Sequence, residues 1–454
     1  MTSPGNKPAL NALPLTARHW YIVLVSSMEQ LIGATLSTIV GIIIPMLNLF
    51  LHPELSAAVQ GIMGAMGLIG IAIGSAIIGP LSDRMGYPGW FRACAVLIII
   101  GSGVASIVDA PIVICAGLFI AGFGVGGGYS LDSNYISELM PDKWKSFMVG
   151  VAKASSAIGF ILPAAIAVII LHAEPSPHVW RQIVWIMGAL GLITLLMRLR
   201  WAESPIWLMA KGKVAEAQKA AQFFFGPNVT VTPLPRQVGQ KTKVSYADLF
   251  KGKNLLRVIY SGIPWACEGL GVYGIGVFLP VLIMALGLES TPLTGIPKVI
   301  NSVELTAIIN FCILPGFIIG LILVNRMNHA TMLWVGFVGS AIGMLLLLFA
   351  YLYHWPMWIS VVAFMSFEIL LNAGPHLITY IIPAAIYPIA YRGAGSGIAD
   401  FLGKLGAILG VFFMPMWLKA GGITLVLIIV IGIMLLGALV SIVFSRLLGL
   451  NVKH

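Results

Sequence analysis

The sequence predicts an all-α membrane protein with twelve transmembrane helices arranged as two six-helix bundles. Only 9% of its 454 residues are charged and 59% are hydrophobic, whereas soluble domains carry roughly 25% charged residues. Apolar runs long enough to cross a bilayer, which takes about 20 helical residues, recur along the whole chain. A polar segment separates these runs into two sets of six.

The expected organisation is a polar tail (1–18), a first bundle (19–199), a linker (200–256), a second bundle (257–446) and a short tail (447–454). The linker is expected to hold an amphipathic helix near 204–224. The first six spans are predicted at 19–47, 57–80, 91–108, 111–137, 146–171 and 180–199. The second six are predicted at 257–287, 299–323, 330–352, 356–386, 393–418 and 422–446.

Lysine and arginine are distributed unevenly between the two sides of these spans. The segments opposite the N-terminus contain only Arg181, Lys298 and Lys419. Cytoplasmic loops carry the excess of Lys and Arg, so both termini and the linker are predicted to be cytoplasmic. The net charge of +10 therefore follows the membrane and indicates no nucleic-acid partner. The four cysteines fall inside apolar runs and indicate neither a disulfide nor a metal site.

Two short patterns occur once in each half. Proline, a cation and glycine have the same spacing in Pro141, Lys145 and Gly150 as in a second set, which consists of Pro388, Arg392 and Gly397. Similarly, the segment 81–85 after the second span resembles 323–327 after the eighth. A duplicated bundle with a site at the interface of its two copies is the plan of a secondary transporter.

The loops between spans carry motifs that resemble the major facilitator superfamily over nearly the whole chain. Residues 79–86 are similar to its G-x-L-x-D-R-x-G signature, and Glu138-x-x-Pro141-x-x-x-Lys145 and Glu203-Ser204-Pro205-x-Trp207-Leu208 resemble motifs of its sugar-porter-like and metabolite:proton symporter groups. Segments 391–393 and 403–408 look like phosphate:proton symporters. The sequence departs from these groups at three positions. Lys145 replaces their Arg, Ala385 replaces their Glu, and Gly128 stands where the phosphate symporters have an acidic residue.

The resemblance implies a gate on the cytoplasmic face. Asp83 is expected to meet the positive N-terminal end of span eleven near Arg392, which would latch an outward-open state. The loop lacks the usual basic residues after Gly86, so a weaker charge network is expected. The residues assigned to the gate are Asp83, Arg84, Gly86, Glu138, Lys145, Lys153, Glu203, Arg392 and Asp400.

Charged residues within the spans are candidates for the transport site, because each costs roughly 2.5–3.5 kcal/mol at a helix centre. Spans one, four, seven and ten line the cavity in the resembled fold, and each carries one acid, namely Glu29, Asp132, Glu268 and Glu368. Asp132 shares a helical face with Gly124 and Gly128. Asp132 is either a proton-titrating carboxylate or the ion-pair partner of Lys153. Glu29, beside Gln30, has either a functional role in transport or a structural role.

Aromatic and basic residues accompany these acids. Glu268 lies near Trp265 and Tyr273, which suits proton coupling or a cationic substrate, or else it bonds a neighbouring helix. Glu368, Asn372 and His376 share a face, and His376 is either a proton relay or a packing residue. Lys404 either pairs with Asp400 one turn earlier or faces the cavity and neutralises an anionic substrate. Lys153 is expected nearer the gate.

Together these features predict a monomeric secondary active transporter of the plasma (cytoplasmic) membrane. The expected partners are the lipid bilayer, protons and a small polar metabolite, preferably an organic or inorganic anion. Protons bound at Asp132, Glu268 or Glu29 would drive symport by alternating access. A proton-coupled efflux antiporter remains an alternative, and a non-transporting sensor is a second class. Nothing in the sequence indicates an enzyme, a cofactor or a metal, because the spacings that such sites need are missing.

Overall fold

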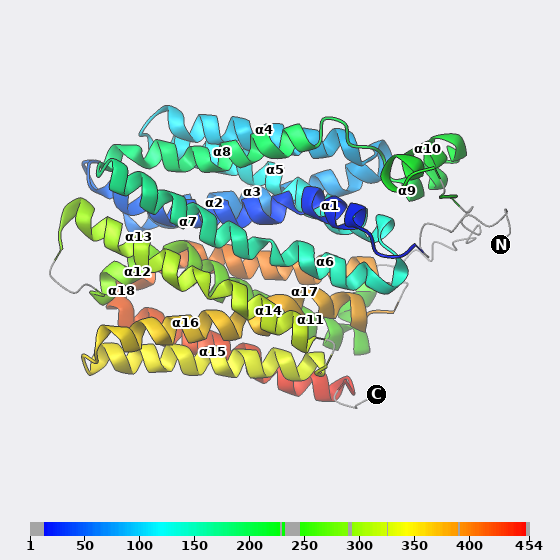
Figure 1. The fold of residues 1–454 in the computed structure, drawn as a ribbon. Helices are drawn as coiled ribbons and strands as arrows, with labels where there is room; N and C mark the ends of the chain where they lie inside the picture. Colours follow the sequence, from blue (N-terminus) through cyan, green and yellow to red (C-terminus); the bar gives the residue numbers. More distant parts are fainter. Residues whose placement is uncertain are drawn as a thin grey trace.

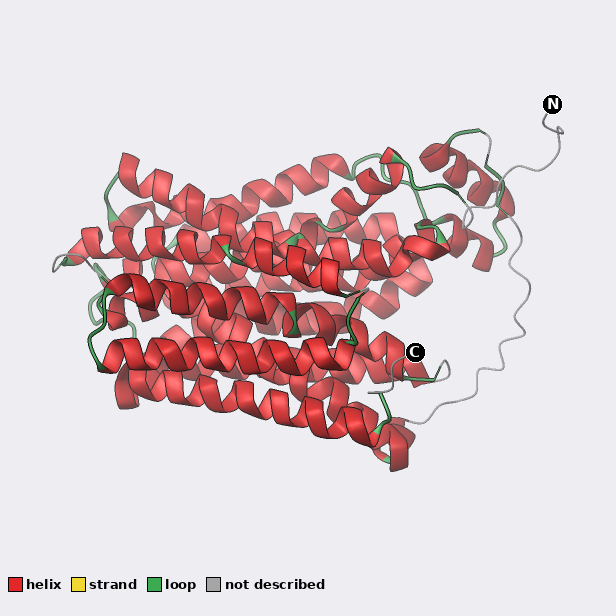
Figure 2. Cartoon of the chain, turned by 60° about the horizontal axis from the view of Figure 1, so that its bottom comes forward, coloured by secondary structure: helices red, strands yellow, loops and turns green. Residues whose placement is uncertain are grey.

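A computed structural model describes residues 13–227, 229–231, 246–288, 293–324, 326–388 and 391–450. Within them, eleven helices are long and apolar enough to cross a membrane. In Figure 1 the long helices run side by side, and the start of α1, the end of α18 and the linker helices α9 and α10 lie at one end. This end is the one that Lys and Arg assign to the cytoplasm. The loops gather at the two ends of the helices (Figure 2).

The first half contains spans one to six. Spans one and five are each interrupted, at Ser27 and Ser155, while the other four are continuous. The helices are α1 (Ala17–Ser26), α2 (Met28–Asn48), α3 (Ala57–Met85), α4 (Tyr87–Ile107), α5 (Pro111–Leu139), α6 (Lys145–Ala154), α7 (Ser156–Ala173) and α8 (Trp180–Met197).

The second half contains the remaining spans. Its helices are α11 (Gly252–Gly269), a π-helical turn η5 (Leu270–Ile275), α12 (Gly276–Leu286), α13 (Gly295–Phe311), α14 (Ile313–Leu323), α15 (His329–Leu352), α16 (Met357–Ala373), α17 (Pro375–Ile386) and α18 (Arg392–Leu447). The backbone of α18 leaves the helical conformation at Gly421 and Gly422. Its apolar stretch of 54 residues is therefore two spans, which gives the twelve that the sequence predicts.

The linker differs from the prediction of one amphipathic helix. It forms two helices, α9 (Pro205–Ala210) and α10 (Val214–Phe225). Gly212 between them has φ +77°, a conformation that glycine adopts without steric cost, so one continuous helix does not form. Ser204 caps α9 by accepting a hydrogen bond from the backbone N–H of Trp207 at 3.3 Å.

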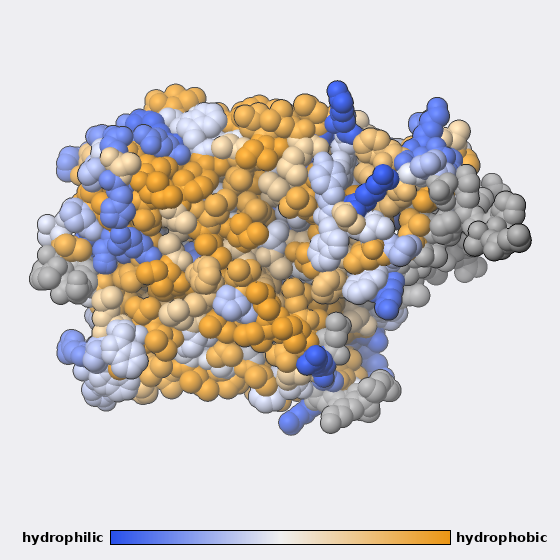
Figure 3. Space-filling model, in the orientation of Figure 1, coloured by the Kyte–Doolittle hydropathy of each residue, from blue (hydrophilic) through white to orange (hydrophobic). Residues whose placement is uncertain are grey.

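The repeated pattern of proline, cation and glycine marks equivalent places in the two halves. Lys145 is the first residue of α6 and Arg392 is the first residue of α18, so a new helix begins at the same distance from Pro141 and Pro388. Side chains on the visible face are apolar around the middle and charged toward both ends (Figure 3). This distribution fits a chain whose middle lies in hydrocarbon.

The two halves touch one another on the side away from the cytoplasm. There α2 packs against α12, and α7 packs against α13. A Cβ added to Gly41 would lie 1.7 Å from the carbonyl oxygen of Val277, so only glycine permits this approach. His172 Nε2 and Glu304 Oε1 lie 2.7 Å apart across the same junction. The outer side is therefore closed, which is the arrangement of an inward-facing conformation.

Candidate substrate and proton site

A cavity of about 960 Å³ lies between the two halves. Residues near the cytoplasmic ends of the helices, such as Pro80, Asn134, Pro383 and Ser396, form part of its wall. Its polar lining comes from both halves and includes Gln30, Ser75, Tyr129, Asn134, Lys153, Trp265, Glu268, Tyr273, His376, Tyr380, Asp400 and Lys404. The cavity is large enough for a metabolite, since ligand pockets measure roughly 300–1,000 Å³.

Lys404 pairs with Asp400 and also lines the cavity, while its expected role of neutralising an anionic substrate stays a prediction. Its ammonium group pairs with the Asp400 carboxylate one turn earlier, at 2.5 Å. The same group donates a hydrogen bond to Ser75 Oγ at 2.9 Å. Ser75 belongs to α3 and Lys404 to α18, so this bond joins the two halves. Lys404 also lines the cavity, so a ligand in the cavity would lie near its positive charge.

Lys153 reaches the cavity from the opposite half. Its ammonium lies 5.9 Å from the centre of the Tyr380 ring, in the range of a cation–π contact. Lys153 follows Pro141 by the same number of residues as Asp400 follows Pro388, so Lys153 and the Asp400 partner of Lys404 occupy equivalent positions in the two halves. Lys153 lines the same cavity as Lys404, and the prediction that it lies nearer the gate than the substrate stays a prediction.

Glu268 and His376 meet in the wall of the cavity. His376 Nδ1 lies 2.8 Å from Glu268 Oε1, and both side chains are almost fully buried. The ring is not oriented for a well-formed hydrogen bond, and His376 Nε2 has no hydrogen-bond partner among the described residues. Span ten breaks at Gly374, and His376 lies in the first turn of α17. Broken helices near the bilayer midplane commonly form transport sites.

Aromatic rings stand beside these charges. The rings of Trp265 and Tyr380 are 6.1 Å apart and nearly perpendicular. A Cβ on Gly403 would come within 2.6 Å of Trp265 Cδ1, so the glycine lets the indole pack against α18 one residue before Lys404. Sequence reasoning named Trp265 but not Tyr380, because a tyrosine in an apolar span gives no signal of its own.

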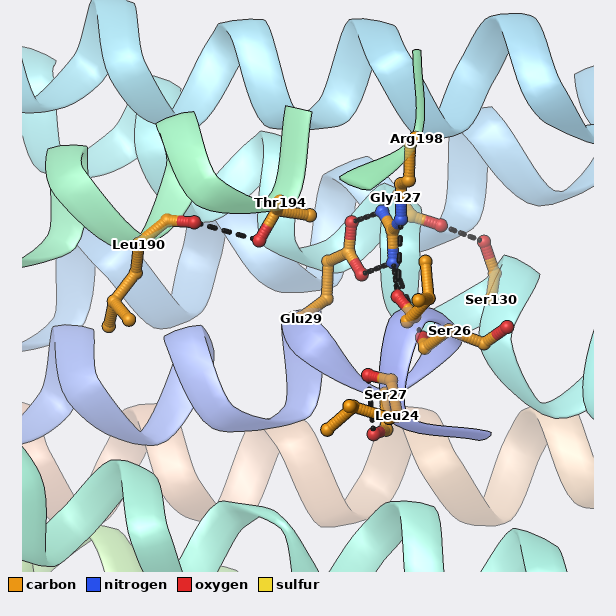
Figure 4. Close-up of polar contacts among 10 residues, drawn as sticks. Leu24, Ser26, Ser27, Glu29, Gly127, Ser130, Leu190, Thr194 and Arg198 are labelled. Atoms are coloured by element: carbon orange, nitrogen blue, oxygen red, sulfur yellow. Dashed lines mark hydrogen bonds and ion pairs between the residues drawn. The ribbon is translucent and has the colours of Figure 1, made fainter. Parts of the chain in front are cut away.

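Glu29 is paired with a residue that sequence reasoning missed (Figure 4). The two terminal guanidinium nitrogens of Arg198 donate to the two oxygens of the Glu29 carboxylate, Nη2 to Oε2 at 2.5 Å, and neither side chain is exposed. Arg198 also donates to the carbonyl oxygen of Val25 at 2.6 Å and lies 4.3 Å from the ring centre of Phe91. In this conformation Glu29 is an ion-pair partner inside the first half, and it does not line the cavity.

Asp132 lies close to this pair rather than to Lys153. It is 1% exposed, and neither carboxylate oxygen has a hydrogen-bond partner among the described residues. The charged groups that act on it most are Glu29 and Arg198. A Cβ on Gly128 would meet Glu29 Cγ at 2.0 Å, so the space that this glycine leaves is filled by Glu29 and not by a ligand. The alternative of an Asp132–Lys153 ion pair is not observed.

Glu368 is placed away from the cavity, although the sequence grouped it with the site. It is buried, and it accepts a hydrogen bond from Asn372 Nδ2 at 3.1 Å within α16. The break at Gly374 ends the shared helical face that the sequence predicts for Glu368, Asn372 and His376. His376 therefore turns toward Glu268 in the wall of the cavity, while Glu368 is buried among the helices of the second half.

The predicted gate is in part a network within the first half. The Glu203 carboxylate accepts hydrogen bonds from the backbone N–H of Tyr87, at 3.0 Å to Oε2, and of Ser204, at 2.9 Å to Oε1. Tyr87 Oη donates to Glu138 Oε1 at 2.9 Å, and Ser204 Oγ bonds Glu138 Oε2. Gly86, with φ +92°, lies so close to Glu203 that a Cβ would meet its carboxylate. Burial raises the pKa of Glu203 above its usual value.

Two further gate residues lie at the ends of helices. Arg84 is exposed, and Lys145 begins α6. The side chains of Asp83 and Arg392 lie outside the described part of the protein, so the predicted latch between them stays a prediction. The sequence drew attention to the Glu203-Ser204 motif, but it gave no sign that Tyr87 and Ser204 both bond Glu138.

Two six-helix halves around a charged midplane cavity define a secondary transporter rather than an enzyme. The chain belongs to the family described as sugar (and other) transporters, whose sequence model matches residues 21–446. It is therefore a multi-pass membrane protein that transports small-molecule metabolites.

Similar proteins share this fold and general activity. The inner membrane metabolite transport protein YgcS of Escherichia coli (strain K12) is 25% identical over 435 residues, which cover 95% of this chain and 92% of that protein. The niacin transporter NiaP of Acinetobacter baylyi is 25% identical over 407 residues, covering 87% and 86%. The partially occluded inward-open structure of the Escherichia coli xylose transporter XylE superposes with a TM-score of 0.77 at 19% identity, covering 93% of this chain and 97% of XylE.

Proposed function

We propose that this protein is a proton-coupled symporter of a small anion. One observation carries the proposal. Lys153 and Lys404, from equivalent spans of the two halves, line one cavity and each contacts the opposite half. Among the described residues, the ammonium of Lys153 is in none of the ion pairs, so its charge is available for an anion. A bound anion would bridge the two halves and favour their movement as a unit.

The charges in the cavity explain why a proton would accompany the anion. The two lysines are balanced by the carboxylates of Glu268 and Asp400, so an entering anion adds one uncompensated negative charge. Isolated charges are costly within the membrane. A proton taken up by the Glu268–His376 pair restores the balance, and both groups are in the cavity wall within 2.8 Å of each other.

Asp132 is the second candidate for the coupling proton. If it were ionised, Asp132 would be a buried carboxylate without hydrogen bonds. The nearby Arg198 is already paired with Glu29. A proton on Asp132 removes this cost. Glu29 itself is tied to Arg198, so we assign it a structural role in the inward-facing state.

A relative named as a phosphate transporter and one named as a niacin transporter, at 24% and 25% identity, support an anion. The cavity acids favour a second candidate, exchange of protons for an organic cation, because Glu268 and Asp400 could also bind a positive charge. The two lysines oppose it.

The test is uptake by purified protein in liposomes with an inward proton gradient, using radiolabelled phosphate, succinate and para-hydroxybenzoate, with protein-free liposomes as control. We expect accumulation of at least one anion, abolished by a protonophore. Accumulation of none of the three, or proton-dependent exchange of a labelled organic cation such as tetraphenylphosphonium instead, would refute the proposal.

A further inference from the structure

Aromatic side chains line the cavity together with its two lysines. Tyr129, Trp265, Tyr273 and Tyr380 all line it. They come from both halves, since Tyr129 lies in α5 and the other three lie in α11, η5 and α17. Trp265 and Tyr380 already adopt the perpendicular geometry that aromatic pairs favour. The cavity therefore offers ring faces and ring edges next to positive charge.

Two buried polar atoms on the same wall lack partners. Gln30 is 3% exposed and its side-chain oxygen makes no hydrogen bond within the described residues. His376 is 2% exposed, and its Nε2 is likewise unpaired there. Buried polar groups are normally hydrogen-bonded, so a polar atom of a ligand in the cavity could pair with either of them.

We infer that the substrate is a monocarboxylate with a single aromatic ring that carries a further polar atom, such as a hydroxyl group or a ring nitrogen. The inference rests on the proposed anion transport. The carboxylate would bind Lys404 and Lys153, and the ring would pack against Trp265 and Tyr380. The ring's polar atom would satisfy Gln30 or His376.

The lining disfavours other anions and sugars. Inorganic phosphate carries more charge in a smaller volume and is best held by several charge-assisted donors, whereas Glu268 and Asp400 place two carboxylates on this wall. A sugar carries no charge to meet the two lysines, and the lining supplies polar contacts through serine and tyrosine hydroxyls and two amides, Gln30 and Asn134. Much of the remaining wall is apolar or aromatic, which suits the faces of a flat ring.

The test compares two ligands that differ in the ring alone. Isothermal titration of the purified full-length protein in detergent would measure the Kd of para-hydroxybenzoate, its ring-saturated cyclohexane analogue and inorganic phosphate. We expect para-hydroxybenzoate to bind about tenfold more tightly than the analogue, which corresponds to two favourable ring contacts. Trp265→Leu should remove this preference, and Trp265→Phe should retain most of it. Trp358→Leu, at an exposed span end, is the matched control.

The outcomes separate this inference from the proposed function. Equal affinity for the two ring compounds, or a preference that survives Trp265→Leu, would overturn the aromatic substrate. Tight binding of phosphate without binding of para-hydroxybenzoate would also overturn it while leaving anion transport intact. If Trp265→Leu does not fold, Tyr380→Leu serves as the second variant with the same expectation. Binding of none of the three anions would contradict the proposed function as well.

Discussion

Lys153 and Lys404 reach across the cavity in opposite directions, each from one half to the other. Lys404 in α18 donates to Ser75 in α3 at 2.9 Å, and Lys153 in α6 lies over Tyr380 in α17. Both lysines belong to spans that the internal repeat makes equivalent. Cations arranged in this way can hold an anion between the halves and release it when the halves separate.

Replacing Lys404 tests this arrangement directly. Lys404→Gln should weaken anion binding by about 30-fold or more, because truncating one member of a buried charged contact costs roughly 2–5 kcal/mol. Lys404→Arg should retain part of the affinity, since the charge remains. The measurement is the concentration dependence of anion uptake in liposomes. Lys419→Gln, outside the cavity, is the control, and an unchanged concentration dependence in Lys404→Gln would exclude the residue from the site.

Neutralising Glu268 tests the proton-coupling group. Glu268→Gln keeps the shape of the side chain but removes its charge, so gradient-driven accumulation should be lost while exchange of labelled for unlabelled anion continues. Asp132→Asn is measured in parallel. Loss of driven uptake in Asp132→Asn alone would assign coupling to Asp132, and full driven uptake in both variants would refute both assignments.

Removing Arg198 should destabilise the first half. Arg198→Gln leaves the Glu29 carboxylate buried without its partner, which costs about 3–5 kcal/mol of unfolding free energy. The double variant Arg198→Gln/Glu29→Gln should recover a large part of this loss, because no charge is then unpaired. Unfolding in detergent measures both. Equal loss in the single and double variants would show that the ion pair does not account for the effect.

Enlarging Gly41 should shift the protein away from the inward-facing state. The carbonyl oxygen of Val277 occupies the place of a Cβ at this position. Gly41→Leu should therefore keep the two halves from closing on the side away from the cytoplasm. A cysteine at Ser396 in the cytoplasmic part of the cavity should then react more slowly with an impermeant maleimide. Gly432→Leu, at a glycine with open space around it, should leave the rate unchanged. A rate unaltered by Gly41→Leu would contradict the outer contact.

Glu203 should make stability depend on pH near the cytoplasmic face. Burial raises its pKa above the ordinary 4.5, so the folded protein holds this proton more tightly than the unfolded chain does. The stabilisation is complete below pH 4.5 and is lost as pH rises through the folded value. The Tm of wild-type protein should therefore fall more from pH 5 to pH 7 than that of Glu203→Gln. Glu216→Gln, on the exposed side of α10, should behave as wild type, and identical profiles for all three would argue against the burial of Glu203.

The sequence predicted the spans well because each is a long apolar run between polar loops, and hydrocarbon thickness sets their length. It also identified Glu268, His376 and Lys404, because charged groups within apolar runs stand out. What it missed depends on side-chain reach across helices. Arg198 lies at the end of span six and bonds a residue of span one, and no spacing in the chain connects Arg198 with Glu29.

Helix breaks account for other differences. The interruption at Gly374 separates Glu368 from His376, although an unbroken helix would place them on one face. Gly212 divides the linker helix in the same way. Glycine in an apolar span indicates close packing as readily as a break, so the sequence alone could not distinguish Gly374 from Gly128.

Proton-coupled anion symport is tested most sharply by measuring proton movement that an anion gradient drives. Liposomes containing the protein and a pH-sensitive dye, with no initial pH difference, would receive an inward gradient of para-hydroxybenzoate, phosphate or succinate, each compared with protein-free liposomes. With proton-coupled symport, at least one of these anions should cause protein-dependent acidification of the interior, which is reduced strongly in Lys404→Gln and abolished in Glu268→Gln. Protein-dependent anion entry without acidification would contradict proton-coupled symport.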